Sequence, residues 1–224
     1  MAHTASTEAA RAEWHRYYGP KRSQHQHMQL DLLGRVPARR VLEIGPYLGY
    51  VTALLDNAGY AVETLDLGPR GFVRPDVPHH DVDLCAALPA TLSGFDAILC
   101  CETLEHIPWD TARAVLGALA GTGAPHLIVS VPWSGADMTL SLHVAARWLR
   151  ASLALKWPNA WRPFTPSRVP MGHQWELGYR GRSLAAWEAA LAAAGWQVRE
   201  RVFTAPTRSV MHLCANAAAT PATG

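Results

Sequence analysis

The feature that most constrains this chain is a strand, a tight turn and a helix between residues 39 and 57. A short apolar run at 41–44 (Val-Leu-Glu-Ile) leads into a glycine-bearing turn at 45–49 (Gly-Pro-Tyr-Leu-Gly), and a helical run follows from Tyr50 to Asn57. In an open parallel sheet, such a turn lies at the carboxyl end of its strand, where a helix N-terminus faces a ligand crevice. The stretch therefore predicts a nucleotide-like cofactor at the turn.

The turn does not fit the dinucleotide fingerprint G-x-G-x-x-G, because Tyr47 stands where a second glycine lets a pyrophosphate approach the backbone. The stretch instead resembles the first motif of class I S-adenosylmethionine-dependent methyltransferases. That motif is a hydrophobic strand that ends in an acidic residue and is followed by G-x-G-x-G. Glu43, Gly45 and Gly49 match it, and Tyr47 replaces the central glycine.

Strand and helix patterns alternate along the rest of the chain. Helices are expected near 110–120 and 183–194, and strands near 60–65, within 76–84, at 95–101, within 123–132, at 196–203 and at 207–215. Alternation through at least five strands predicts an α/β fold with a Rossmann-like, doubly wound, mostly parallel sheet. The resemblance implies seven strands, of which the last is antiparallel.

Two segments are set apart from this pattern. Residues 1–38 are interpreted as an N-terminal helical cap before the domain at 39–224, with helices at about 6–18 and from 20 to about 34, and the polar run at 21–27 as a solvated helix face. Residues 133–182 are expected to form a lid insertion, with a helix at about 139–155 and a loop rich in tryptophan and proline. Because leading helices often cover the cofactor in the resembling family, Tyr17 and Tyr18 either close the site or pack on the sheet edge.

Composition narrows the classes of function. The chain has 224 residues, of which 17% are charged and 49% hydrophobic, and a net charge of +2, so neither disorder nor a strongly basic nucleic-acid surface is indicated. Its four cysteines form no C-x-x-C pair, which indicates a reducing compartment. No signal peptide and no apolar run that could span a bilayer are evident. We expect a cytoplasmic protein that acts on a small molecule rather than on nucleic acid; its oligomeric state is not predicted.

Acids at strand ends are candidates for holding the cofactor. Asp66 ends the second strand, where a carboxylate can accept hydrogen bonds from both ribose hydroxyls; Glu63 is the runner-up, and an exposed loop acid is the alternative. In the resembling family an acid after the third strand holds the adenine amino group, which implies Asp83, or Asp81 as the competing choice. The full set of implied cofactor-binding residues is Glu43, Gly45, Pro46, Tyr47, Gly49, Asp66, Leu67, Asp83, Leu84 and Cys101.

A cluster of acids and imidazoles follows the strand at 95–101. If 102–106 forms one helical turn, Glu102, Glu105 and His106 share one face. Two carboxylates so close repel each other unless a proton or a metal ion lies between them. A second histidine, His173, lies in the loop before the last helix, three residues before Glu176, which is interpreted as an acid that orients it.

The pairing of E-x-x-E-H with a later H-x-aromatic-E resembles two metal-dependent families. They are the ubiquinone-biosynthesis (UbiG) O-methyltransferases and the Hen1 family, which methylates the 2′-hydroxyl at RNA 3′ ends. The resemblance implies a divalent ion, with Mg²⁺ favoured, held by Glu102, Glu105, His106 and His173, of which the last three are assigned catalytic roles. The alternative is a metal-free site in which His106 is the general base.

The predicted activity is S-adenosylmethionine-dependent O-methylation of a small aromatic or vicinal-diol molecule with divalent-metal assistance. An alcohol or phenol attacks a methyl group well only as its oxyanion, and a metal ion lowers the pKa of a bound hydroxyl. Flat apolar walls for the substrate are expected from Trp133, Trp157, Trp161 and Trp175. The alternatives are RNA 3′-terminal 2′-O-methylation, a cofactor-binding protein with a redirected, non-methylating activity, and metal-free N- or C-methylation.

Overall fold

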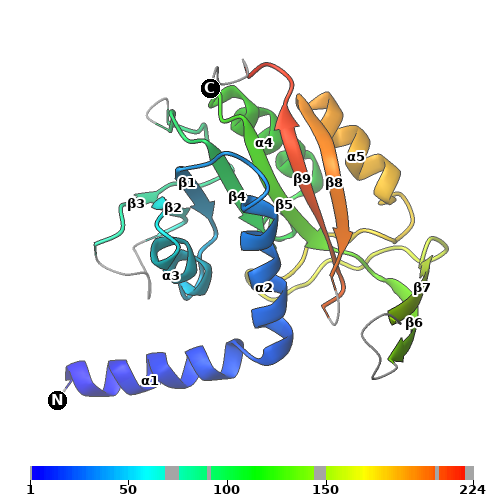
Figure 1. Cartoon of the computed structure of the whole chain (residues 1–224), viewed down its shortest axis with the longest axis horizontal. Helices are drawn as coiled ribbons and strands as arrows, with labels where there is room; N and C mark the ends of the chain where they lie inside the picture. The colour runs from blue at the N-terminus through cyan, green and yellow to red at the C-terminus, as the bar shows by residue number, and fades with distance from the viewer. Residues whose placement is uncertain (1, 69–75, 90–91, 144–149, 205–206, 220–224) are drawn as a thin grey trace.

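The computed structural model describes residues 2–68, 76–89, 92–143, 150–204 and 207–219 (Figure 1). Its centre is a seven-stranded sheet in the order β3-β2-β1-β4-β5-β9-β8. The strands are β1 (Arg40–Ile44), β2 (Ala61–Asp66), β3 (His79–Asp81), β4 (Ala97–Cys101), β5 (His126–Pro132), β8 (Trp196–Phe203) and β9 (Ser209–Asn216). Neighbours from β3 to β5 are parallel, and β9 is antiparallel to both β5 and β8. The predicted α/β, doubly wound, mostly parallel sheet is confirmed.

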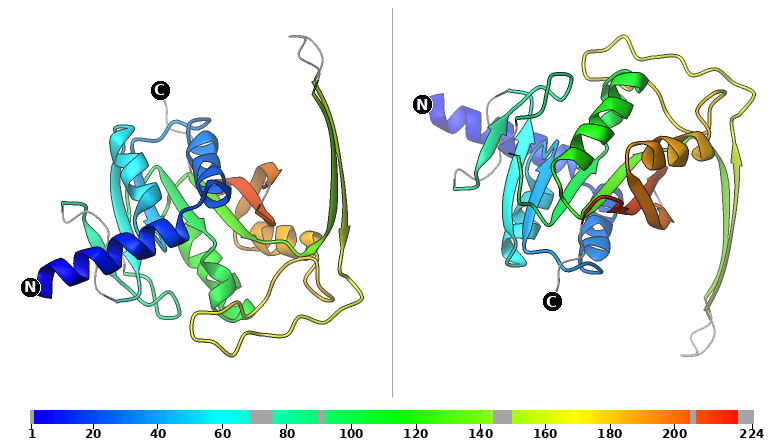
Figure 2. Two further views of the ribbon diagram at one scale, coloured as in Figure 1. Left: turned by 90° about the horizontal axis from the view of Figure 1, so that it is seen from below. Right: turned by 90° about the horizontal axis from the view of Figure 1, so that it is seen from above.

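Helices cover both faces of this sheet (Figure 1). The clusters of buried side chains place α2 (Pro20–Leu33) and α3 (Tyr50–Asn57) on one face and α4 (Trp109–Gly121) and α5 (Leu184–Ala193) on the other. The first helix, α1 (Ala2–Tyr17), extends away from the body (Figures 1 and 2). Among the described residues, no helix combines the length and the apolar character that crossing a bilayer requires.

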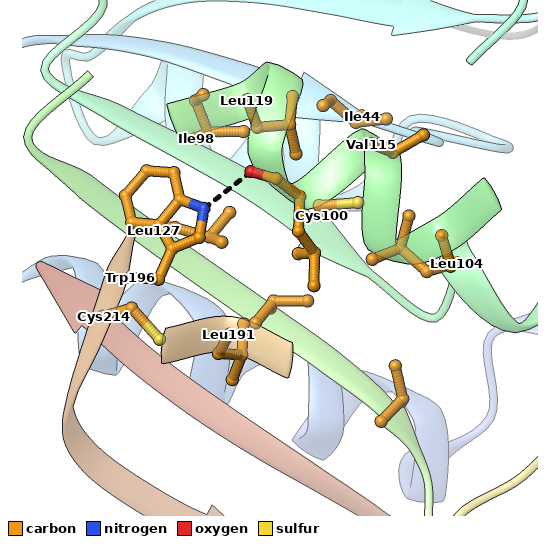
Figure 3. Close-up of a cluster of buried hydrophobic side chains, with 14 of the residues drawn as sticks. Ile44, Ile98, Cys100, Leu104, Val115, Leu119, Leu127, Leu191, Trp196 and Cys214 are labelled. Atoms are coloured by element: carbon orange, nitrogen blue, oxygen red, sulfur yellow. Dashed lines mark hydrogen bonds between the residues drawn. The ribbon is translucent and has the colours of Figure 1, made fainter. Parts of the chain in front are cut away.

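The larger core lies between the sheet and α4 and α5 (Figure 3). Trp196, at the start of β8, is fully buried there, with Leu127 and Leu191 in the same cluster. Its indole N–H donates to the Leu116 carbonyl at 2.9 Å, so this large side chain is buried without an unpaired donor. This packing fixes α4 and α5 on one face of the sheet. The carboxyl ends of the parallel strands are left free for a site.

The insertion between β5 and α5 differs from the expected helical lid. Instead of a helix at 139–155, the chain forms a two-stranded antiparallel ribbon of β6 (Gly135–His143) and β7 (Arg150–Pro158), with register from Gly135↔Pro158 to His143↔Arg150. The helix prediction is wrong because the apolar positions 138, 140 and 142 alternate with the polar positions 139 and 141, a period of two that is typical of a strand. A loop then returns from 159 along the body to α5 (Figure 2).

Candidate functional site

A cavity of about 1100 Å³ opens at the carboxyl ends of β1, β2, β4 and β5. Its walls come from the two N-terminal helices, the turn after β1, the segment after β4, the loop at 171–179 and the start of β9. Tyr17 and Tyr18 both line it, so the leading helices cover this end of the sheet. The predicted site residues in its lining are Glu43, Gly45, Pro46, Tyr47, Asp66, Cys101, Glu102, Glu105, His106, Trp133 and His173.

Several predicted site residues lie outside the described lining: Gly49, Leu67, Asp83, Leu84, Trp157, Trp161 and Trp175. Asp83 instead accepts a hydrogen bond from the Cys85 N–H at 2.8 Å. Trp175 is 2% exposed and donates its indole N–H to the Ile107 carbonyl at 3.0 Å, so it is a core residue. Trp157 and Trp161 are exposed on the surface. Of the four tryptophans expected to wall the substrate, only Trp133 lines the cavity.

The turn after β1 keeps the backbone of a three-glycine motif. Gly45, Tyr47 and Gly49 all have positive φ, at 72°, 50° and 74°. A Cβ at Gly45 would lie 2.4 Å from the Thr103 hydroxyl oxygen, so a side chain is excluded there. Tyr47 adopts the left-handed conformation that glycine favours, and its hydroxyl donates to Glu13 of α1 at 2.9 Å. The tyrosine therefore preserves the turn and ties it to the N-terminal helix.

Two acids stand beside this turn. Glu43 is 5% exposed and accepts a hydrogen bond from the Thr52 hydroxyl, and burial raises the pKa of Glu43 to about 7. Asp66, at the end of β2, accepts a hydrogen bond from the Leu67 N–H at 2.8 Å, and burial also raises its pKa. Both carboxyl groups line the cavity at adjacent strand ends, as expected for parallel strands.

Glu105, His106 and His173 form one group at the end of β4. Their ligand atoms all lie within 4.8 Å of one another, and Glu105 Oε1 is 3.9 Å from Nε2 of each histidine. Glu105 is fully buried, and neither of its carboxylate oxygens has a hydrogen-bond partner among the described residues. Burial and the nearby charge of Glu102 raise the pKa of Glu105 well above its usual value. A buried carboxyl without partners needs a proton or a cation.

His173 is held in place from two sides. Its Nδ1 lies 2.9 Å from Glu176 Oε1, which raises the pKa of His173 and leaves Nε2 directed toward Glu105. The Gln174 N–H donates to the Glu105 carbonyl at 2.7 Å and ties the loop to the short 3₁₀ helix η1 (Leu104–His106). Glu105 and His173, which are 68 positions apart in sequence, are therefore adjacent in space. Burial and the neighbouring His173 lower the pKa of His106, which favours its neutral form.

Glu102 does not belong to this group. The condition of a single helical turn over 102–106 is not met, because η1 begins at Leu104 and Glu102 has a left-handed backbone with φ of 53°. Its carboxylate accepts hydrogen bonds from the hydroxyls of Ser130 at 2.9 Å and Ser209 at 3.0 Å. Its Oε1 also lies 3.9 Å from Nε2 of His25. Glu102 thus lines the same cavity with its hydrogen bonds already made.

Comparison with known proteins gives one sequence relative and many structural ones. No family model matches the chain. A segment of 96 residues, 38% of this chain and 40% of the relative's length, is 28% identical to the ubiquinone biosynthesis O-methyltransferase of Paracidovorax citrulli (strain AAC00-1). The glycopeptide N-methyltransferase MtfA, solved with S-adenosyl-L-methionine, matches with a TM-score of 0.58 at 14% identity over 89% of this chain and 95% of that chain. The chain has the class I methyltransferase fold.

A further structural match is also a methyltransferase domain. The methyltransferase domain of bacterial CtHen1 matches with a TM-score of 0.58 at 14% identity, over 87% of this chain and 99% of that chain. At such identities these structures establish the fold alone. In a class I methyltransferase fold, as in other doubly wound sheets, ligands bind outside the carboxyl ends of the strands, where the cavity of this chain lies.

His25 is the residue that the sequence interpretation missed. The run at 21–27 was expected to be a solvated helix face, yet His25 is 5% exposed, lines the cavity, and has Nδ1 3.3 Å from the Thr207 hydroxyl. A signal was present, because His25, Gln29, Leu32 and Leu33 recur at helical spacing and are the buried positions of α2. Two of these four are polar, so the stripe does not stand out by hydropathy.

Proposed function

We propose that this chain is an S-adenosylmethionine-dependent O-methyltransferase that acts, with a divalent metal ion, on a hydroxyl of a small aromatic or vicinal-diol acceptor. The observation that carries the proposal is the buried, unpartnered carboxylate of Glu105 between two histidines, in the cavity that also contains the turn after β1. The sequence relative is named as an O-methyltransferase, which supports the choice of a hydroxyl as the methyl acceptor.

The donor set fits a divalent transition-metal ion. Glu105, His106 and His173 offer one carboxylate oxygen and two imidazole nitrogens within 4.8 Å of one another. Imidazole suits Fe²⁺ or Zn²⁺ and carboxylate suits Mn²⁺, whereas Mg²⁺ takes oxygen ligands almost throughout. We therefore prefer a transition metal to the Mg²⁺ that the family resemblance favours. When bound, such an ion would lower the pKa of an acceptor hydroxyl and supply positive charge for its oxyanion.

The residues around the turn after β1 would hold the cofactor, which supplies the electrophilic methyl group. Gly45 and Tyr47 line the cavity at this turn, and Asp66 stands where a carboxylate can accept from ribose hydroxyls. Glu102, fixed by its two serines, lines the same cavity. The chain thus brings a cofactor site and a proton-removing site to one cavity, so that a bound acceptor is held near both.

Side chains of the protein itself position the acceptor hydroxyl and can take up its proton. In the metal-free alternative, His106, whose pKa is lowered, can accept a proton from the acceptor hydroxyl at its Nε2, whereas with an ion bound that nitrogen would be a ligand. Glu176 fixes the orientation of His173, and Trp133 offers an apolar wall beside the group.

Methyl transfer to a panel of catechols tests the proposal. Purified protein, labelled S-adenosylmethionine and each catechol are incubated with Mn²⁺ or with excess EDTA. We expect a monomethylated product and S-adenosylhomocysteine in the first case, and a loss of at least about 100-fold with EDTA that added Mn²⁺ reverses. Undiminished turnover in EDTA would instead support the metal-free alternative, in which His106 is the general base.

RNA 2′-O-methylation is the second candidate. It is favoured by three exposed cations in the cavity lining, Lys21, Arg22 and Arg208, which suit a phosphate backbone, and by the likeness to CtHen1. The net charge of +2 weighs against it. The test is the same assay with small RNAs in place of catechols. Methylation of the ribose at the RNA 3′ end would make RNA the preferred acceptor instead of a small molecule. Cofactor binding by calorimetry without any methylated product would indicate the redirected, non-methylating alternative.

A further inference from the structure

The ribbon of β6 and β7 presents an uncovered apolar face. It extends from the body as a two-stranded arm (Figure 2). The register pairs Met138 with Leu155 and Ala136 with Trp157, and cross-strand partners share one face of a ribbon. Met138, Leu153, Leu155 and Trp157 are between 36% and 56% exposed. The described positions on this face are therefore apolar and open to water.

The opposite face of the ribbon turns toward the body. Lys156, between Leu155 and Trp157 in β7, has its Nζ 5.3 Å from the ring centroid of Trp133 and 4.9 Å from that of Phe203. Since side chains alternate along a strand, the apolar face points away from these rings. An isolated two-stranded ribbon is marginally stable in water, and an uncovered apolar face makes it less so. The ribbon needs a partner.

A second apolar surface lies on the returning loop. Trp161, Val169 and Met171 are 68%, 69% and 69% exposed. The described chain exposes nine large hydrophobic side chains, and seven of them belong to the ribbon or to this loop. In Figure 2 the ribbon extends away from the loop, so the two surfaces do not cover each other within one chain. Two copies of the chain can cover both.

The surface area that would be buried favours one of two arrangements of two copies. Strands of nine residues make a ribbon about 30 Å long and about 10 Å wide, or roughly 300 Å² on one face. Two ribbons packed face to face would bury about 600 Å² in total, which is the size of a crystal contact. If each ribbon packs on the partner's loop, four such surfaces are covered and the total is about 1200 Å², the lower limit of specific interfaces. Reciprocal contact is therefore favoured.

We propose that the chain forms a two-fold dimer in which the apolar face of each β6–β7 ribbon packs on the partner's loop between Trp161 and Met171. Such an exchange is symmetric and closed, so it ends at two copies. The net charge of +2 opposes association only weakly. Met171 also lines the cavity, so each ribbon would lie at the mouth of the partner's site. The dimer does not require the metal or the acceptor proposed above.

Sedimentation of the full chain at 10–100 µM tests the dimer, and a mass of twice 24.4 kDa is expected. The double variant Leu153→Glu with Leu155→Glu should sediment as a monomer, because charge on the apolar face cannot be buried unpaired. The matched control Ser152→Glu with Ala154→Glu places the same charges at alternating positions of the same strand and should remain a dimer. Circular dichroism verifies that both variants fold.

Disulfide trapping tests which surfaces meet. In a Cys85→Ser background, which removes the exposed native thiol, chains with Leu155→Cys are mixed with chains with Met171→Cys. We expect oxidation to join position 155 of one chain to position 171 of the other. A disulfide between two Leu155→Cys chains would overturn the reciprocal arrangement. A wild-type protein that sediments as a monomer, or that binds as a monomer to anionic vesicles in a flotation experiment, would overturn the dimer. Calorimetry with S-adenosylmethionine on the same samples tests the proposed function separately.

Discussion

Glu102 and Glu105 are three residues apart and line the same cavity, yet their surroundings are opposite. Glu102 accepts hydrogen bonds from two serines on neighbouring strands and remains partly open to the cavity. Glu105 is fully buried and has no hydrogen-bond partner in the described chain. The first arrangement stabilises the fold, and the second costs stability unless a cation is bound. Under the proposed function, Glu102 is assigned to the structure of the site and Glu105 to metal binding.

The largest expected effect separates these two acids by metal affinity. Sites with four ligands bind Zn²⁺ with about 10–16 kcal/mol, so the loss of one ligand should cost on the order of 100- to 1,000-fold. We expect that loss for Glu105→Gln and less than about 10-fold for Glu102→Gln, measured as the Kd for Mn²⁺ by calorimetry. Equal losses in the two variants would make Glu102 a fourth ligand, as the family resemblance implies.

Glu43 is buried like Glu105 but has one hydrogen-bond partner, the Thr52 hydroxyl, so it is intermediate between these two acids. Its pKa is raised from 4.5 to about 7, so the folded state retains a proton that the unfolded state releases. The stability that this proton binding gives the folded state is fully present below pH 4.5. It is lost as pH rises to about 7, and the free energy of unfolding falls by about 1.4 kcal/mol per pH unit, or about 3 kcal/mol in total. Urea unfolding from pH 4.5 to 8 should show this decline in the wild type relative to Glu43→Gln. Parallel profiles of the two proteins would contradict it.

Stability in EDTA should change in opposite directions at the two acids. Glu105→Met replaces a buried, unpartnered carboxyl with an apolar side chain and should stabilise the metal-free protein by about 1–2 kcal/mol. Glu102→Ala leaves the hydroxyls of Ser130 and Ser209 without their acceptor and should destabilise it by about 1–2 kcal/mol. Thermal unfolding of both variants is the measurement. Destabilisation by Glu105→Met would show that the carboxyl has a structural partner.

The smallest expected effect belongs to Glu176, which contacts His173 rather than the ligand group as a whole. Glu176→Gln should weaken Mn²⁺ binding by about 10-fold, because the orientation of His173 is loosened. The variant also removes the interaction that raises the pKa of His173, so protons compete less well for its Nε2. The apparent pKa in the pH dependence of the Mn²⁺ Kd, which is independent of the overall loss of affinity, should therefore move downward, and its value is the midpoint to compare. An unchanged midpoint would assign Glu176 to another role.

Local patterns in the sequence predicted the architecture. The strand, turn and helix from Arg40 to Asn57 and the succession of strands and helices along the chain follow from periodicity and turn residues, which neighbouring positions determine. The closeness of Glu105 and His106 follows from adjacency. The ribbon was missed although its period of two is present in the sequence, because an apolar run between strands and helices in this fold favours a helix by position.

By itself, the sequence therefore determined the α/β sheet, its cofactor turn and the residue types of the acid and imidazole group. Only the tertiary structure decided what each member touches. Ser130 and Ser209 lie 28 and 107 positions from Glu102, and His25 reaches the cavity from a helix that precedes the sheet. Local sequence fixes backbone conformation within a few residues, whereas burial and hydrogen-bond partners depend on segments that meet only when the sheet is assembled.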